Sequence, residues 1–318
     1  MVGLVSTVIP VFNRPAMLVE AVDSVMAQSW RPIEIVLVND GSTDETASII
    51  DTLRATCPEE VKVIHKANGG PAMARQAGLE MSTGEFVQFL DSDDLLLPDK
   101  FALQIAGLRD DKDAGISYGK TYVSEHGVRA EHPAQRTGER HRTLFPALLQ
   151  EPLWPTLTPL YRRSIVDAIG PWPDKRQLED WEYDAQAGAL GVKLHYCDAY
   201  IAETRNHEDA RLCHLWKTDR AAMRDRILAY TSVHAHALRA GVERRSDEMQ
   251  QFARSLLWMA RLAGQNGFAK EAAELFAVSR ATATEPGFEY RVYDLLARAV
   301  GWAAIGRLAA QVDSWRKL

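Results

Sequence analysis

The first hundred residues alternate between strand-like and helix-like segments, and this order restricts the chain to few folds. Runs rich in apolar and β-branched residues predict four strands, at residues 2–11, 33–38, 61–64 and 86–90. Apolar residues at helical spacing predict three helices between them, at residues 15–28, 43–55 and 71–81. This order predicts an α/β fold with a mostly parallel sheet and flanking helices. In such sheets ligands bind beyond the carboxyl ends of the strands.

The strand predicted at 86–90 ends in three carboxylates, Asp91, Asp93 and Asp94. An extended backbone directs Asp91 and Asp93 the same way, because they are two residues apart. Neighbouring carboxylates repel unless a positive charge lies between them. A hard divalent cation that carries phosphate oxygens would meet this need. The other interpretation, which these residues alone leave open, is an acidic loop that caps the helix expected after Leu97-Pro98.

Charge is unevenly distributed along the 318 residues. Residues 1–210 hold 20 Lys and Arg against 32 Asp and Glu, whereas residues 211–318 hold 17 against 11, so their formal charges are −12 and +6. The basic part could contact anionic lipid or an anionic acceptor. It could equally be a solvated helical surface. Overall composition, with 46% apolar and 25% charged residues, is that of a soluble globular protein with a sizeable core.

Cysteine usage and hydropathy indicate the compartment. The three cysteines, one of them Cys213, are an odd number without CxxC spacing, which argues against a disulfide framework and a thiolate zinc site. No basic leader precedes the first strand, and no run reaches the roughly 20 apolar residues that span a bilayer. We therefore expect a cytoplasmic protein, with peripheral contact at the inner face of the plasma membrane as an open alternative.

The chain is expected to divide near residue 210. Residues 1–210 form the predicted α/β domain, which continues with a strand at 116–124, a polar loop at 127–143 and three further elements. Those elements are a helix at 162–168, a helix at 179–190 and a strand at 192–201, and a short helix is also expected at 145–150. Residues 211–318 read as almost entirely helical. Their amphipathic stretch from Tyr290 to Leu308 could pack on its own domain, on a partner subunit or on a membrane surface.

Five blocks of residues, in this order, resemble the motifs of family-2 glycosyltransferases with the GT-A (Rossmann-like) fold. They are Val5–Arg14, Val38–Asp44, Gly69–Gly78, Asp91–Asp94, and Gly170-Pro171-Trp172 followed by Leu178–Glu182. The resemblance covers about the first 210 residues, and the ordered set is far more specific than a single DxD. It implies an inverting enzyme that transfers a sugar from a nucleotide-diphosphate sugar, most often a UDP-sugar, to a hydroxyl acceptor. The acceptor would be a glycan, a lipid-linked glycan or a glycoconjugate, as in bacterial surface polysaccharide synthesis.

The resemblance also implies roles for donor-side residues. The loop with Pro10, Phe12 and Arg14 would bind base and ribose, and Asp40 would contact the uracil; an Asx-turn with Gly41 is the alternative for Asp40. Arg75 would reach a phosphate or the base, unless it is a solvated arginine paired with Glu80 or Glu85. Asp91 and Ser92 would contact the nucleotide sugar, and Asp94 would play a supporting role. Asp93 would ligate Mn²⁺ or Mg²⁺, which stabilises charge on the departing diphosphate.

On the acceptor side the match falls on a helix start. Asp180 matches the family's proposed base, and Glu179 and Trp181 would bind the acceptor. The alternative is that Glu179 and Asp180 only complement the helix dipole. His207 follows a strand signal in Arg205-Asn206-His207 and would be a further metal ligand, although a solvated loop histidine fits as well.

Two other classes of function are alternatives to a glycosyltransferase. A nucleotidylyltransferase shares a similar sheet but needs a glycine-rich phosphate loop after the first strand, and Val11-Phe12-Asn13-Arg14-Pro15 lacks one. A non-catalytic nucleotide- or sugar-binding scaffold is disfavoured by the presence of both Asp93 and Asp180. The identity of the sugar, the acceptor, the linkage, the preferred metal and the oligomeric state are all left open.

Overall fold

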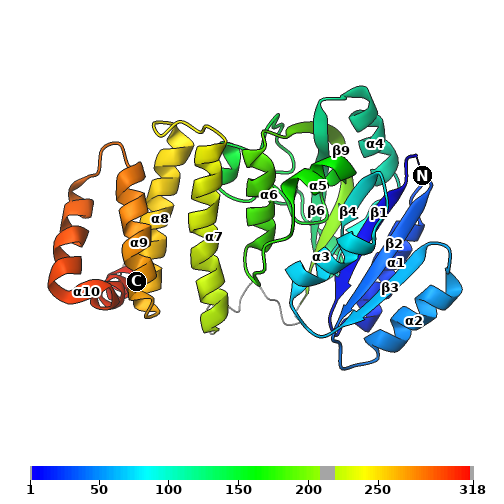
Figure 1. The fold of residues 1–318 in the computed structure, drawn as a ribbon, viewed down its shortest axis with the longest axis horizontal. Coiled ribbons are helices and arrows are strands. Elements are labelled where there is room, and N and C mark those ends of the chain that lie inside the picture. The colour runs from blue at the N-terminus through cyan, green and yellow to red at the C-terminus, as the bar shows by residue number, and fades with distance from the viewer. Residues whose placement is uncertain (1, 208–218, 316–318) are drawn as a thin grey trace. The chain divides into compact units, whose positions relative to one another are not determined.

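The computed structural model describes residues 2–207 and 219–315, which form two compact units. The first comprises residues 1–144 and 152–210, and the second comprises residues 145–151 and 211–318 (Figure 1). The short segment 145–151 thus belongs to the helical unit, although the sequence-based division places it in the α/β domain. Cys213 lies outside the described residues.

The first half of the sheet has the predicted βαβαβαβ order. Its parallel strands lie in the order β3-β2-β1-β4, and they are β1 (Val5–Val11), β2 (Ile33–Asp40), β3 (Val61–Lys66) and β4 (Phe86–Phe89). The connecting helices are α1 (Pro15–Met26), α2 (Thr46–Thr56) and α3 (Pro71–Met81). Every residue of β1 and β2 is buried, as expected for strands covered on both faces.

The second half of the sheet is mixed. Beyond β4 the order is β8-β6-β9-β5, where β8 (Leu160–Arg162) is antiparallel to β4 and β6 (Ala114–Glu125) is parallel to β9 (Lys193–Asn206). Two short strands, β5 (Leu95–Leu96) and β7 (Val128–Arg129), pair antiparallel with β9 and β6. The helices of this half are α4 (Lys100–Asp110), α5 (Arg163–Ile169) and α6 (Glu179–Ala189). The predicted fold class, a parallel-rich α/β sheet with an added helical region, is confirmed.

Helix α3 lies unusually close to the sheet. A Cβ atom placed on Gly78 would be 2.4 Å from Val8 Cγ1 and 3.0 Å from Val38 Cγ2. Only glycine permits this approach, because any side chain would push the helix outward. The close packing fixes the position of α3, which carries Arg75 one turn earlier.

The second unit contains four helices and a short 3₁₀ turn in its described part. They are η1 (Ala147–Leu149), α7 (Arg220–Arg239), α8 (Asp247–Gln265), α9 (Ala269–Thr282) and α10 (Phe288–Trp315). Helix α10 is broken at Gly301, which has a φ of 76°, so the amphipathic stretch expected from Tyr290 to Leu308 is not one straight helix. Tyr290 and Ile305 are buried in the unit, whereas Leu295 is 70% exposed.

In the ranges 2–207 and 219–315, no helix combines the length and the apolar content that crossing a bilayer would require.

Candidate active site

Two loops at the carboxyl ends of β1 and β2 are tied together by hydrogen bonds. The Asn13 amide N–H donates to Ser42 Oγ (3.1 Å), and the Thr43 N–H donates to Asn13 Oδ1 (2.8 Å). The Arg14 N–H donates to Thr46 Oγ1 (3.2 Å) at the start of α2. The segment predicted to bind base and ribose is thereby held in place, with the Phe12 ring 46% exposed and Pro10 buried in β1.

The Asp40 side chain fixes the turn that precedes α3. Its Oδ1 accepts from Lys66 Nζ (2.7 Å) and from the Gly69 N–H (2.9 Å), and its Oδ2 accepts from the Gly70 N–H (2.8 Å). Gly70 has a φ of 89°, a conformation that favours glycine. The Asx-type turn considered for Asp40 is instead made by Asn39, whose Oδ1 accepts from the Ser42 N–H (2.9 Å). Contact between Asp40 and a nucleobase stays a prediction.

Asp93 is the meeting point of three distant parts of the chain. Its Oδ2 accepts from Arg14 Nη1 and from His207 Nε2, the latter at 2.8 Å. Burial alone would raise the pKa of Asp93, but the Arg14 charge and the His207 hydrogen bond outweigh burial and lower it. The structure thus places His207, at the end of β9, directly beside the carboxylate that was predicted to hold a metal.

Asp93 and His207 together fit a sparse metal site. Carboxylate and imidazole are both ligands of Mn²⁺, and Mg²⁺ needs only one or two carboxylates when phosphate oxygens complete its shell. Among the residues that the structure describes, no group of three or more His, Cys, Asp and Glu side chains is arranged to hold an ion. Metal binding by Asp93 and His207 stays a prediction.

Arg75 lies inside the molecule and not on its surface. Its side chain is 4% exposed, Nη2 bonds Asp91 Oδ1 at 2.6 Å, and Nη1 bonds Glu179 Oε1 at 2.9 Å. Its guanidinium also lies over the Trp172 ring, 4.9 Å from the centroid. Burial would lower the pKa of Arg75, but the two carboxylates raise it. Arg75 pairs with Asp91 and Glu179 rather than with the surface acids Glu80 and Glu85, and its contact with a nucleotide stays a prediction.

Helix α6 begins with two acids, the buried Glu179 and the half-buried Asp180. It follows Leu178, whose φ of 58° turns the chain sharply, and Glu179 and Asp180 form its first turn. Burial and the neighbouring Asp180 charge raise the pKa of Glu179 to about 7, against the opposing effect of Arg75. The pKa of Asp180 is also raised by burial, and Arg75 moderates that rise. A carboxyl group with raised proton affinity suits general base catalysis.

Asp184 was missed by the sequence reasoning. It follows Asp180 by one helical turn, is 5% exposed and accepts from the Tyr161 hydroxyl at 3.3 Å. Burial and the Asp180 charge raise its pKa well above the usual value, and the Tyr161 and Trp154 hydrogen bonds only partly oppose this. The i, i+4 spacing from Asp180 was the available signal, because it places both acids on one face of the helix.

The tryptophans near the acceptor-side blocks are core residues. Trp172 stacks on Tyr183 with ring centroids 4.1 Å apart, and both rings meet Phe89 edge-on. Trp154 and Trp181 are also buried, at 2% and 4% exposure. The predicted acceptor contact of Trp181 is untested, but a fully stacked sugar would need this ring to be uncovered.

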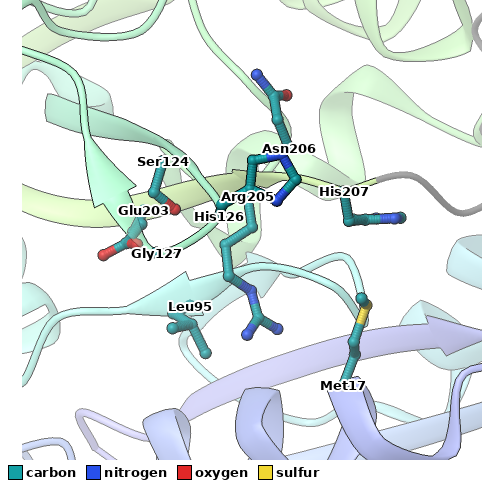
Figure 2. A pocket seen from close by; sticks show the side chains of 9 residues that line it. All are labelled: Met17, Leu95, Ser124, His126, Gly127, Glu203, Arg205, Asn206 and His207. Atoms are coloured by element: carbon teal, nitrogen blue, oxygen red, sulfur yellow. The ribbon is translucent and has the colours of Figure 1, made fainter.

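Arg205 closes the loop that carries the three aspartates. Its N–H donates to Asp94 Oδ1 (2.9 Å), its Nε donates to the Asp93 carbonyl (2.6 Å), and its Nη1 pairs with Glu20. Asp94 thereby supports this loop, and both Asp94 and Ser92 are buried. Figure 2 shows Arg205 extending from β9 toward Met17 and Leu95, within a pocket of about 610 Å³. The pocket is also lined by Ser124, His126, Gly127, Glu203, Asn206 and His207.

Related proteins of known sequence are glycosyltransferases by name. The chain is 34% identical over 150 residues to an uncharacterized glycosyltransferase of Rickettsia conorii, and these residues are 46% of this chain and 24% of that protein. It is 30% identical over 209 residues to one of a Nostoc species, which is 64% of this chain and 62% of that protein. The chain thus spans less than two thirds of the length of these relatives.

Solved structures agree with the fold. Staphylococcus aureus TarS 1–349 in complex with UDP-GlcNAc superposes with a TM-score of 0.68 at 20% identity, over 96% of this chain and 91% of that chain. Pyrobaculum calidifontis mannosyltransferase PcManGT in complex with GDP-Man and Mn²⁺ has a TM-score of 0.55 at 17% identity, over 99% of this chain and 88% of that chain. These likenesses show the GT-A fold.

The family model described as glycosyl transferase family 2 matches residues 6–170, which is just over half of the chain. This range contains the strand ends that hold Arg14, Asp40, Asp91 and Asp93. The chain therefore belongs to glycosyl transferase family 2.

Proposed function

We propose that the protein transfers a sugar from a nucleotide-diphosphate sugar to a hydroxyl acceptor, with inversion at the anomeric carbon. One observation carries the proposal: the Asp91–Asp93 loop is contacted from the donor side by Arg14 and, through Arg75, is joined to Glu179 at the start of α6. Donor-side and acceptor-side motifs that are far apart in sequence therefore share one site. Family membership supports the same reaction.

The donor is proposed to lie across the ends of β1, β2 and β4. Phe12 is exposed and so available to contact a base. Arg14 bonds the Asp93 carboxylate, and its guanidinium would also attract a phosphate bound beside that carboxylate. Further donor contacts are proposed for Pro10, Asp40, Asp91 and Ser92, whereas the two terminal nitrogens of Arg75 already bond carboxylates. A UDP-sugar is favoured, and UDP-GlcNAc and GDP-mannose, bound by the two structural neighbours, are the donors to test first.

Asp93 and His207 would hold Mn²⁺ or Mg²⁺. When bound, such an ion stabilises the negative charge that develops on the leaving diphosphate. Asp91 is 32% exposed at its side chain and so remains available to the donor while it pairs with Arg75.

Asp180 is proposed as the base. It accepts the proton of the acceptor hydroxyl while that oxygen bonds the anomeric carbon and the bond from this carbon to the diphosphate oxygen breaks. The nucleoside diphosphate leaves with the bonding electrons, and Asp180 later releases its proton to water. Burial raises the pKa of Asp180 and so strengthens it as a base. Glu179 and Trp181 are proposed to position the acceptor.

The acceptor is proposed to be a glycan, a lipid-linked glycan or a glycoconjugate, as in bacterial surface polysaccharide synthesis. The catalytic domain would comprise residues 1–210, and the helical region 211–318 would serve acceptor, membrane-surface or subunit contacts. This arrangement fits a cytoplasmic enzyme, alone or at the inner face of the membrane.

A thermal-shift screen tests the donor site. UDP, GDP and dTDP are each added with and without Mn²⁺, since a ligand present at 100 times its Kd stabilises the fold by about 2.7 kcal/mol. We expect UDP with Mn²⁺ to give the largest rise in Tm, and release of UDP from UDP-GlcNAc to follow. A shift with GDP alone would change the donor, no nucleotide response would contradict the proposed function, and binding without turnover would favour a non-catalytic scaffold.

A further inference from the structure

We propose that Arg75 acts as a positioning residue that joins the donor-binding loop to the helix that carries the base. This inference rests on the proposed transfer reaction and assigns a different role to a residue of the same site. The guanidinium is the physical link between Asp91, which follows β4, and Glu179, which begins α6.

The geometry of the link is that of a two-sided clamp. The two terminal nitrogens of one planar guanidinium bond two carboxylates, at 2.6 Å to Asp91 and 2.9 Å to Glu179. Arginine can do this because its donors are fixed in one plane, whereas a lysine ammonium is a point charge. Movement of Asp91 is therefore transmitted to Glu179.

Arg75 is itself held firmly from its other sides. The Trp172 ring lies 4.9 Å from its guanidinium carbon, and Trp172 is stacked in turn on Tyr183 of α6. The backbone N–H of Trp172 donates to Gln76 Oε1 (3.1 Å), so the loop that carries Trp172 is bonded to α3. Gly78 presses α3 against β1, which leaves the base of the Arg75 side chain little freedom.

These contacts argue against a nucleotide ligand as the main role of Arg75. Its side chain is 4% exposed, and both terminal nitrogens are already bonded to carboxylates. A phosphate would have to displace one of these buried pairs, and breaking a buried ion pair leaves an uncompensated charge. Asp180 directly follows Glu179, so fixing Glu179 also fixes the proposed base relative to the donor.

The test separates donor binding from turnover. We expect Arg75→Gln to lower kcat for UDP-GlcNAc hydrolysis with Mn²⁺ by about 100-fold, the effect of misplacing a reacting group by about 1 Å. The Kd of UDP, measured by calorimetry, should stay within threefold of the wild-type value. Arg75→Lys keeps the charge but not the planar set of donors, so it should recover only part of kcat. It replaces Arg75→Gln in the test if the glutamine variant does not fold.

A double-mutant cycle tests whether Arg75 acts through Glu179. If Arg75 acts through Glu179, the double variant Arg75→Gln/Glu179→Gln should be no slower than the slower single variant, because both changes remove one link. Arg140→Gln is the matched control, since Arg140 also pairs with a carboxylate (Asp198, 2.9 Å) but its side chain is 72% exposed. This control should keep kcat within twofold.

Each outcome decides the inference. A rise of tenfold or more in the Kd of UDP for Arg75→Gln would make Arg75 a donor ligand and overturn the positioning role. Additive losses in the cycle would overturn the link to Glu179. If the wild-type protein turns over neither UDP-GlcNAc nor GDP-mannose, the proposed function fails. If the wild type is active and Arg75→Gln keeps the wild-type kcat, only the positioning role fails.

Discussion

The carboxyl groups of the site fall into two regions that differ in their partners. At the ends of β2 and β4, Asp40, Asp91 and Asp93 each bond a lysine or arginine side chain. Along α6, the half-buried Asp180 and the buried Asp184 accept from backbone, tyrosine or indole donors and have raised pKa values. Glu179 belongs to both regions, because it pairs with Arg75 and yet has its pKa raised to about 7.

This difference separates two chemical tasks. A carboxylate that accepts from a cationic side chain can also accept from a sugar hydroxyl or ligate a metal with its remaining lone pairs. A desolvated carboxyl group binds a proton more readily and is suited to accept one during the reaction. One site thus presents binding groups on the strand side and proton-accepting groups on the helix side.

Removing the proposed base should have the largest effect. We expect Asp180→Asn to lower kcat by about 10³-fold, within the range for loss of a general base, while the Kd of UDP stays unchanged. Steady-state kinetics and calorimetry check this, with the exposed Asp174→Asn as the control. In the wild-type protein kcat should fall on the acid side, at a pH above that of an ordinary aspartate, because the pKa of Asp180 is raised. Full activity of Asp180→Asn would place the base elsewhere.

A strand-side carboxylate should matter for stability. We expect Asp40→Ala to lower the free energy of unfolding by about 3 kcal/mol, because the buried Gly70 N–H and the half-buried Gly69 N–H lose their charged acceptor. Denaturant unfolding of both proteins measures this difference. Asp51→Ala is the control, since Asp51 is an exposed partner of His65 and its loss should cost less than about 0.5 kcal/mol. Equal costs for the two variants would contradict the structural role of Asp40.

Per pH unit, the smallest expected change in stability is a pH dependence on the helix side. The folded-state pKa of Asp184 is raised, so the folded protein binds more protons than the unfolded chain above about pH 4. Wild-type stability should therefore fall relative to Asp184→Asn as pH rises from 4 to 7, by at most about 1.4 kcal/mol per pH unit. The asparagine oxygen can still accept from Tyr161 and Trp154.

Asp198→Asn is the control for this measurement, because the pKa of Asp198 is lowered whereas that of Asp184 is raised. Hydrogen bonds from Lys120 and Arg140 lower the pKa of Asp198, so its contribution is present above about pH 4 and is lost as pH falls. The difference between wild type and Asp198→Asn should be constant from pH 5 to 7. A flat difference for Asp184→Asn in the same range would mean that Asp184 is ionised in the fold.

The sequence predicts best where local pattern decides the structure. Helix α3 was predicted at its observed bounds, 71–81, because Pro71 marks its start and apolar spacing continues to Met81. Strand β9 was predicted to end at Ile201 but continues to Asn206. Its last residues are polar, and pairing with β6 and β5 keeps them extended.

In the candidate site, contacts between residues far apart in sequence were even harder to predict than strand ends. The motifs predicted which residues gather at the strand ends, but not how those residues pair with one another. Arg14 and Asp93 are 79 residues apart, and Arg75 and Glu179 are 104 apart. Such pairs depend on tertiary packing and leave no local pattern. The burial of Asp184 was likewise not predicted, because its donors Tyr161 and Trp154 come from other parts of the chain.

The contact of Gly78 with Val8 has a consequence for mutational tolerance. Position 78 touches no proposed substrate group, yet even a methyl group there would overlap the sheet and displace Arg75 from its two carboxylates. A library selected for turnover should retain glycine at this position as strictly as it retains the acids themselves. Strict retention of a residue in this protein can therefore report the spacing between a helix and a strand rather than chemistry.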